Sequence, residues 1–337
     1  MNRSLVPFFA STGIAFFFAA SSCGARDTRG GSDASTDAGP LNDAGTPNDG
    51  GDAGDGGANS LPSFTVQSPE IDVPAGTELV TCYYFRTPND AGINVKTWKS
   101  TLTTGVADVS LLFTAADIAT PGTVTENGCT MLGDFMAPST WAYTTHKASD
   151  GWSFPADDGT GKPVANPVKA QQPGYLLIHA VNPTNATLKV QATLEATGYA
   201  LGTVVTQAES FVTFNSAISI PPMGSSSAVN TCPVPAGAHF SYLTTFSRKK
   251  SVQTQVKDMM TTLFVSTDFE NPGATTWAQA PFGAFTSNHV TVQCDYVNVG
   301  NNMITAGDSL SDEACMVLGF HFPATKSRLC INNTLLP

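Results

Sequence analysis

Basic residues are scarce in this sequence. The 337 residues include 16 lysines and arginines against 27 acidic residues, so the formal net charge is −11 at neutral pH. A chain with this balance lacks the excess positive charge that binds phosphate backbones and anionic surfaces. The composition therefore argues against a nucleic-acid-binding protein, and the acidic excess favours solubility.

Familiar catalytic motifs are also absent. The sequence has no Cys-x-x-Cys pair, no Gly-x-Ser-x-Gly elbow and no glycine-rich phosphate loop that opens a helix. Its five histidines form no His-x-His or His-Glu-x-x-His cluster of the kind that binds zinc. The acidic pairs Asp157-Asp158 and Asp312-Glu313 are interpreted as solvated turns or caps, in preference to a glycosidase acid pair.

Helical periodicity is nearly absent as well, since almost no stretch keeps apolar residues at helical spacing for three turns. From Leu61 onward the chain has short β-rich runs, such as Leu79–Phe85, Tyr175–His179 and Met259–Val265. Turn signals such as Asn182-Pro183-Thr184 separate them. The pattern predicts an all-β protein built of sandwiches.

The first 23 residues resemble a secretory signal. Arg3 precedes an apolar run, Leu5 to Ala20, that is too short for a comfortable bilayer span. The run leads into Cys23 through small residues, as in a bacterial lipoprotein box, although Ala20 stands where leucine is commoner. We expect residues 1–23 to be a lipoprotein signal and Cys23 to carry the lipid, which would anchor the protein in the bacterial cell envelope, at the outer membrane or cell surface. The alternative is an ordinary cleaved signal peptide.

Residues 24–61 form a low-complexity segment rich in glycine, aspartate and alanine, in which Asp-Ala-Gly recurs. Low hydrophobicity and like charges leave such a segment unable to bury a core, so we expect a disordered linker. A calcium-binding repeat is the alternative, but the regular nonapeptide period is missing.

Six cysteines follow Cys23, and their even number in an exported chain predicts an oxidised framework. Sequence alone allows fifteen pairings of six cysteines. Two Pro-Ala-Gly turns, at residues 74–76 and 235–237, each precede a predicted strand. They suggest two related sandwiches in tandem, over residues 62–202 and 203–337.

Short motifs over residues 64–334 resemble the copper type II, ascorbate-dependent monooxygenases, the family of peptidylglycine α-hydroxylating and dopamine β-monooxygenases. They are Val73-Pro74-Ala75-Gly76 with Cys82, Trp98-Lys99-Ser100, Leu177-Ile178-His179-Ala180-Val181-Asn182-Pro183, Val234-Pro235-Ala236-Gly237, Val292-Gln293-Cys294 and Asp312-Glu313-Ala314-Cys315. The resemblance implies two jelly-roll-like sandwiches that face each other across a solvent-filled cleft, with one copper in each. It also implies the disulfides Cys82–Cys129, Cys232–Cys330 and Cys294–Cys315.

The first copper site of that family uses two adjacent histidines and a third histidine on a later strand. By resemblance the adjacent pair falls on Ala107 and Asp108, and the third ligand falls on His179. Asp108 and His179 offer one oxygen and one nitrogen to a metal. A carboxylate is a poor donor for copper that cycles between Cu(II) and Cu(I). The alternative is that His179 is a hydrogen-bonded core residue.

The second copper site of the family uses His-x-His and a methionine. By resemblance Phe246 and Arg248 occupy the histidine positions, and Ala314 occupies the methionine position. Phenylalanine and alanine side chains have no donor atom, and arginine is always protonated. Five of the six implied copper ligands are therefore replaced.

These substitutions leave the enzymatic status open. We expect a lipid-anchored envelope protein that keeps the monooxygenase fold and acts in binding or scaffolding, with copper absent or weakly bound. A peptide or small organic ligand would enter the cleft near Arg248. The alternative is a residual copper-dependent, ascorbate-driven monooxygenase that uses Asp108 and His179, and a third interpretation is a purely structural surface component.

Overall fold

The computed structural model describes residues 61–336 apart from 130–132, 135–136, 139 and 308–310. The expected signal sequence, its Cys23 and residues 24–60 of the expected linker lie outside the described residues. Within the described part every regular element is a β-strand, which confirms the all-β prediction. The same residues contain no helix that is long and apolar enough to cross a membrane.

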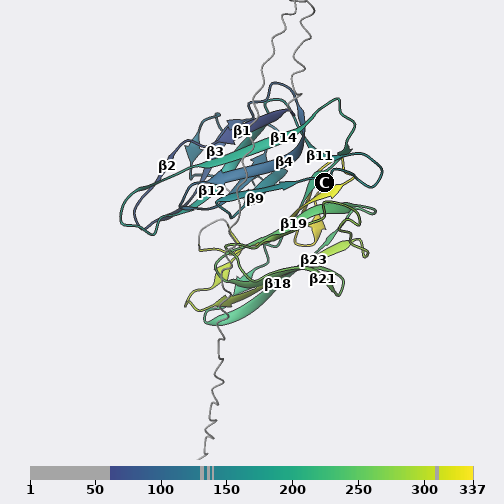
Figure 1. The fold of residues 1–337 in the computed structure, drawn as a ribbon. Helices are drawn as coiled ribbons and strands as arrows, with labels where there is room; N and C mark the ends of the chain where they lie inside the picture. The colour runs from purple at the N-terminus through teal and green to yellow at the C-terminus, as the bar shows by residue number, and fades with distance from the viewer. Residues whose placement is uncertain (1–60, 130–132, 135–136, 139, 308–310, 337) are drawn as a thin grey trace, which may run out of the picture. The chain divides into compact units, whose positions relative to one another are not determined.

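Two sheets and two short ladders form the first half of the described chain (Figure 1). Sheet 1 has the order β1 (Ser63–Gln67), β14 (Ala192–Ala200), β4 (Ile93–Leu102), β11 (Val164–Val168) and β15 (Thr206–Gln207), with β10 (Ser149–Ser153) also paired to β4. Sheet 2 has the order β6 (Val124–Thr125), β3 (Glu78–Arg86), β12 (Pro173–Val181), β5 (Val106–Phe113) and β9 (Thr140–Thr145). The ladders are β13 (Leu188–Val190) with β2 (Ile71–Val73), and β7 (Gly133–Asp134) with β8 (Ala137–Pro138).

The second half repeats this arrangement with its own sheets. Sheet 3 has the order β22 (Ala274–Thr276), β19 (His239–Ser247), β25 (Cys315–Phe322), β16 (Glu209–Phe214), β26 (Arg328–Ile331) and β27 (Thr334–Leu335). Sheet 4 has the order β18 (Gly224–Pro233), β23 (His289–Asn298), β20 (Ser251–Asp258) and β21 (Thr261–Ser266). A short ladder joins β17 (Ser219–Ile220) to β24 (Ile304–Thr305).

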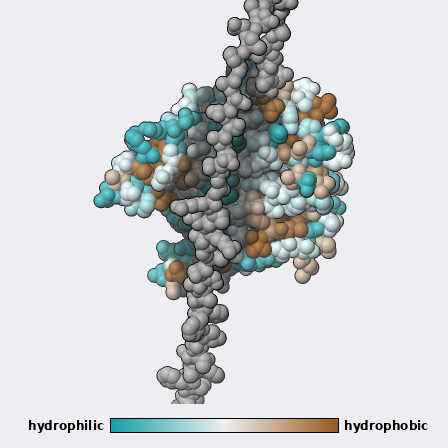
Figure 2. Space-filling view, viewed as in Figure 1, coloured by the Kyte–Doolittle hydropathy of each residue, from teal (hydrophilic) through white to brown (hydrophobic). Residues whose placement is uncertain are grey.

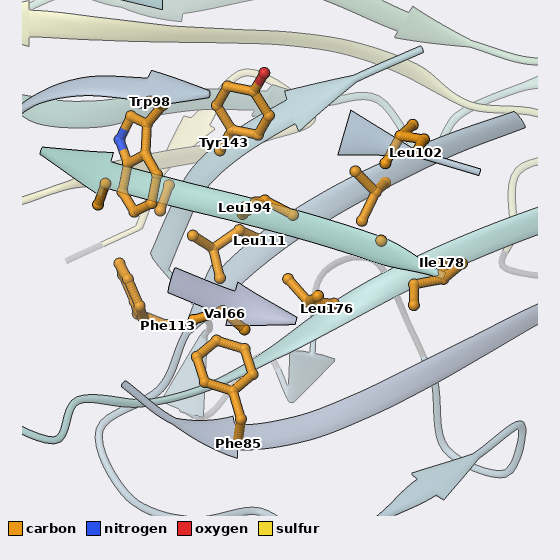
Figure 3. Packing of buried hydrophobic residues seen from close by; sticks show 14 of the residues in the cluster. Val66, Phe85, Trp98, Leu102, Leu111, Phe113, Tyr143, Leu176, Ile178 and Leu194 are labelled. Carbon is orange, nitrogen blue, oxygen red and sulfur yellow. The ribbon is translucent and has the colours of Figure 1, made fainter. Parts of the chain in front are cut away.

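Alternating side chains build the apolar core of each half. Along β1 the burial pattern is exposed-buried-exposed, so that Phe64 and Val66 face inward. They join a core between sheets 1 and 2 in which Trp98 and Tyr143 lie with ring centroids 6.1 Å apart (Figure 3). Sheets 3 and 4 enclose a second core that includes Phe211 and Phe240.

Sheets 2 and 3 are buried on both faces. Every residue of β25 is buried, and so are most residues of β12 and β5. Such continuous burial requires a covering layer on each side of a strand. On the faces turned away from the two cores, side chains of both sheets form one shared apolar cluster. Its buried members are Cys82, Tyr84, Leu112, Trp141, Tyr175, Leu177, Val212, Phe246, Ala314, Met316 and Leu318. Over this contact the two sandwiches are packed together, where the resemblance implied an open, solvent-filled cleft.

The described residues accordingly form one compact unit. Three disulfides cross-link it, and they are the pairs that the resemblance implies. Cys82 bonds Cys129, Cys232 bonds Cys330, and Cys294 bonds Cys315. The last two lie in the core between sheets 3 and 4. Three disulfides fit an oxidising, extracellular type of compartment.

The predicted start of one strand is wrong. The run Met259–Val265 was expected to be a strand throughout, but Met259 and Met260 form the turn between β20 and β21. Met259 has a φ of 52°, and Met260 is 94% exposed. The apolar run suggested burial, whereas the hairpin register places the turn at these two methionines. The face of the described residues seen in Figure 2 mixes hydrophilic and hydrophobic residues.

Candidate functional site

A row of three polar residues crosses sheet 2 on the face turned toward sheet 3. Asp108 of β5 is paired with His179 of β12. On the other side, Val109 is paired with Thr145 of β9, and this antiparallel register brings His146, the next residue, beside Asp108. Neighbouring strands therefore place His146, Asp108 and His179 in one line across the sheet.

His179 is held between two carboxylates. Its Nδ1 lies 2.7 Å from Asp108 Oδ2, and its Nε2 lies 2.8 Å from Glu78 Oε1. Burial lowers the pKa of His179, but hydrogen bonds and charge from Asp108 and Glu78 outweigh burial and raise the pKa above its ordinary value. The geometry and the pKa both favour an imidazolium that donates one hydrogen bond from each ring nitrogen.

Glu78 extends this chain of charges to the second half. Its other carboxylate oxygen, Oε2, accepts a hydrogen bond from the Lys249 ammonium group. Burial tends to raise the pKa of Glu78, but the hydrogen bonds from Lys249 and His179 outweigh it and lower the pKa. The Glu78–Lys249 ion pair joins the two halves.

The opposite wall of the site is the turn between β19 and β20. Phe246 lies near the end of β19, and Arg248, Lys249 and Lys250 form the turn. The carboxylate of Glu313 accepts hydrogen bonds from the backbone N–H groups of Arg248 (3.0 Å) and Lys250 (2.6 Å). Glu313 is 1% exposed, so a buried anion fixes the backbone of this basic turn.

A cavity of about 370 Å³ lies between the polar row and the basic turn. Its apolar lining includes Val80, Val106, Leu177, Val181, Phe246 and Phe269. Its charged and titratable lining consists of Asp108, His146, His179, Arg248, Lys249 and Glu270. Five of the six positions singled out in the sequence meet here, since Ala107, Asp108, His179, Phe246 and Arg248 all line the cavity. The volume falls within the range of small-molecule sites.

Ala314, the sixth position, lies elsewhere. Its side chain is buried in the apolar cluster between sheets 2 and 3, and its carbonyl oxygen accepts a hydrogen bond of 2.9 Å from the Tyr296 hydroxyl. Met316, two residues further on, has its side chain in the same apolar cluster. The nearest methionine in the sequence therefore supplies packing to this interface.

These residues do not fit a copper pair. At the first implied copper site, both nitrogens of His179 already bind carboxylates, and the Ala107 side chain has no donor atom. At the second position Phe246 and Arg248 offer no lone pair to a cation. In the described part of the chain no three histidine, cysteine, aspartate or glutamate side chains are grouped to hold a metal ion. The donor set is that of an ion-pair network.

Sequence reasoning missed Glu78, His146 and Glu313 as parts of this site. Each comes from a different segment. Strand pairing places Glu78 and His146 at the polar row, and hydrogen bonds join Glu313 to the basic turn. No spacing in the sequence relates them. Glu313 was read as part of a solvated acidic pair, but it is buried. The sequence did not predict that the Glu313 carboxylate is buried beside the basic turn.

Comparison with known proteins adds little to this description. No family model matches the chain, and no curated protein matches it either. Among solved structures, the major capsid protein P2 of bacteriophage PM2 matches 77% of this chain and 97% of its own, with 7% identity and a TM-score of 0.29. Structures of Sulfolobus Turreted Icosahedral Virus and of an archaeal virus with a triple jelly roll fold match 76% and 78% of this chain, and 59% and 61% of their own. Their identities are 8% and 9%, and both TM-scores are 0.20. Likenesses at this level carry no argument about this protein.

Proposed function

We propose that this chain is a binding protein that takes a small, largely apolar organic ligand into the cavity between sheets 2 and 3. One observation carries the proposal. Five of the six positions that the family resemblance assigns to copper binding line one cavity of about 370 Å³, but their side chains are apolar or already paired. Ligand sites in proteins commonly combine apolar walls with a few placed polar groups.

The binding function can be tested with a fluorescent apolar probe such as 1-aminoanthracene. Ala107 lines the cavity, so Ala107→Trp would fill it and is expected to reduce probe uptake at least tenfold. Ala91 is exposed in the segment between β3 and β4, and Ala91→Trp serves as the matched control with unchanged uptake. Equal uptake by both variants would place the probe outside the cavity and contradict the proposal.

In this proposal the copper chemistry of the resembling family has been lost. The alternative, a residual ascorbate-driven monooxygenase, requires copper at Asp108 and His179, where Asp108 and Glu78 already occupy the imidazole nitrogens. Incubation of the mature chain with Cu(II), followed by electron spin resonance, is expected to show no tightly bound copper. Two tightly held coppers per chain, with oxygen uptake that depends on ascorbate and is abolished by His179→Ala, would support the alternative.

We also propose that the protein is anchored to the bacterial envelope through a lipid on Cys23. The lipoprotein-like sequence around Cys23 supports this, and the three disulfides fit an exported protein. Residues 24–61 would then be a tether for the two sandwiches, which would cover residues 62–202 and 203–337. Incorporation of labelled palmitate tests the anchor, and it is expected to disappear in Cys23→Ala.

A further inference from the structure

Two buried polar atoms in the cavity wall have no hydrogen-bond partner. They are Oδ1 of Asp108 and Nε2 of His146. Asp108 is only 5% exposed, and its other oxygen is bonded to His179. A buried polar group that is left unpaired destabilises the folded protein. Most buried polar groups in folded proteins have a hydrogen-bond partner. Two such atoms without a partner at a cavity wall therefore indicate where a polar group of a ligand can bind.

The two atoms belong to neighbouring positions on neighbouring strands. The pairing of Val109 with Thr145 sets Asp108 beside His146, where side chains lie within reach of one ligand atom. Both residues line the cavity. The ring of Phe246, from the opposite wall, packs against His146 with centroids 5.9 Å apart. Phe246 therefore forms the side of the cavity that contacts His146.

The chemistry of the pair matches one hydroxyl group. A carboxylate oxygen only accepts hydrogen bonds, whereas a neutral imidazole nitrogen donates in one tautomer. A hydroxyl group donates once and accepts, so it satisfies both atoms together. Burial lowers the pKa of His146, and although the charge of Asp108 acts in the opposite direction the net shift keeps the ring neutral. A neutral ring supports the donor tautomer.

The charge balance of the site favours a neutral head group. Asp108 is already compensated by His179, and Glu78 by His179 and Lys249. A ligand carboxylate would be repelled by Asp108, and a ligand ammonium group would approach an imidazolium that already neutralises that carboxylate. Arg248 and Glu270, which also line the cavity, carry opposite charges. Neither an anion nor a cation therefore gains a clear advantage in this cavity.

We propose that the cavity selects a small neutral alcohol or phenol, whose hydroxyl group donates to Asp108 Oδ1 and accepts from His146 Nε2. The apolar body of the ligand packs against Leu177, Val181 and Phe269. This inference rests on the proposed binding function, because it names the ligand class of the same cavity. His146, which the sequence left without a role, becomes the residue that sets specificity.

The test compares two ligands of nearly equal shape on the unchanged mature protein. Isothermal titration calorimetry with p-cresol and p-xylene is expected to show at least about tenfold tighter binding of p-cresol, the factor that corresponds to one paired buried group. In His146→Phe, which keeps an aromatic ring against Phe246, the ratio is expected to fall toward one. His289→Phe, at the exposed start of β23, is the matched control and should keep the ratio.

The outcomes separate the two proposals. Equal affinity for p-cresol and p-xylene would overturn hydroxyl recognition and leave the binding function standing. Tighter binding of 4-methylbenzylamine than of p-cresol would overturn the neutral head group. No binding of any of the three at millimolar concentration would overturn the inference and count against the proposed function. The ligand comparison needs no variant, so misfolding of His146→Phe would not rescue the inference.

Discussion

The role of the His179 side chain depends on the residues that contact it. The resemblance assigns it to a metal, yet in this chain Asp108 and Glu78 bind both of its nitrogens. Asp108 supplies a carboxylate at the position that faces the ring. With both ring nitrogens bonded to carboxylates, His179 is part of an ion-pair network.

Histidine titration provides a prediction at the residue scale. Two-dimensional NMR of the histidine rings should give His179 a midpoint above the ordinary value of about 6.5. Burial lowers the pKa of His321 to about 4, although the bond to the Glu209 carbonyl oxygen acts the other way. The titration midpoint of His321 should therefore lie below that of His179. Coincident midpoints for the two residues would contradict the described contacts.

The raised pKa of His179 also predicts how stability depends on pH. A group whose folded pKa exceeds its unfolded pKa stabilises the protein fully below the unfolded value, and that contribution is lost as pH rises through the folded value. The difference in unfolding free energy between the natural protein and His179→Gln should therefore shrink as pH rises above about 6.5. Urea unfolding at a series of pH values measures this difference in unfolding free energy. A difference that grows with pH would contradict the ion-pair network.

Glu313 yields a prediction about the basic turn. In Glu313→Gln one of the two backbone N–H groups of Arg248 and Lys250 loses its carboxylate acceptor. The unpaired group is expected to lower the unfolding free energy by about 1–3 kcal/mol. Glu270→Gln, at an exposed position that also lines the cavity, is the control and should change stability little. An equal effect of both substitutions, measured by urea unfolding, would contradict this role.

At the scale of elements, the second sandwich depends on covalent links between its sheets. Cys232 of β18 bonds Cys330 of β26, and Cys294 of β23 bonds Cys315 of β25. Both bonds join sheet 4 to sheet 3 across a shared core. The two disulfides therefore link sheets 3 and 4 covalently.

The two links should differ in their effect on stability. The Cys232–Cys330 bond closes 98 residues and the Cys294–Cys315 bond closes 21. In the loop-entropy model the longer link contributes about 4–5 kcal/mol and the shorter about 3 kcal/mol. Replacing each pair by alanines and measuring thermal unfolding should therefore show a larger loss for the longer link. Unchanged melting temperatures would mean that the disulfides do not act on the unfolded chain in this way.

At the scale of the whole molecule, the contact between sheets 2 and 3 couples the two sandwiches. Tyr175 and Leu177 of β12 share one apolar cluster with Met316 and Leu318 of β25. A second cluster at the interface stacks Trp152 on Tyr242 with centroids 4.6 Å apart. Burial of this kind ties the stability of one half to that of the other.

Cooperative unfolding is the prediction that follows for the whole molecule. Calorimetry of the disulfide-bonded protein should show one transition, with equal calorimetric and van't Hoff enthalpies. Leu177→Ala opens the shared cluster and should lower stability by about 2–5 kcal/mol. Two separate transitions in the natural protein would contradict the coupling.

Much of the fold was predictable because local physics governs it. Short β-rich runs bounded by turn signals identified β3 and β12, and the even cysteine number indicated disulfides whose pairing the resemblance then supplied. The run Met259–Val265 was misread because hydrophobicity does not reveal a hairpin turn when its residues are exposed methionines. Asp108 and His179 were linked in advance only through the family resemblance.

By itself, the sequence determined the strand-rich architecture and the oxidised cysteines, since these depend on residue type and short-range pattern. Tertiary structure alone decided which groups meet. Strand register placed His146 beside Asp108, and the packing of sheets 2 and 3 brought Lys249 to Glu78. These pairs are separated by tens to more than a hundred residues in the chain. Contacts of that kind arise from the arrangement of strands, which no local pattern of residues specifies.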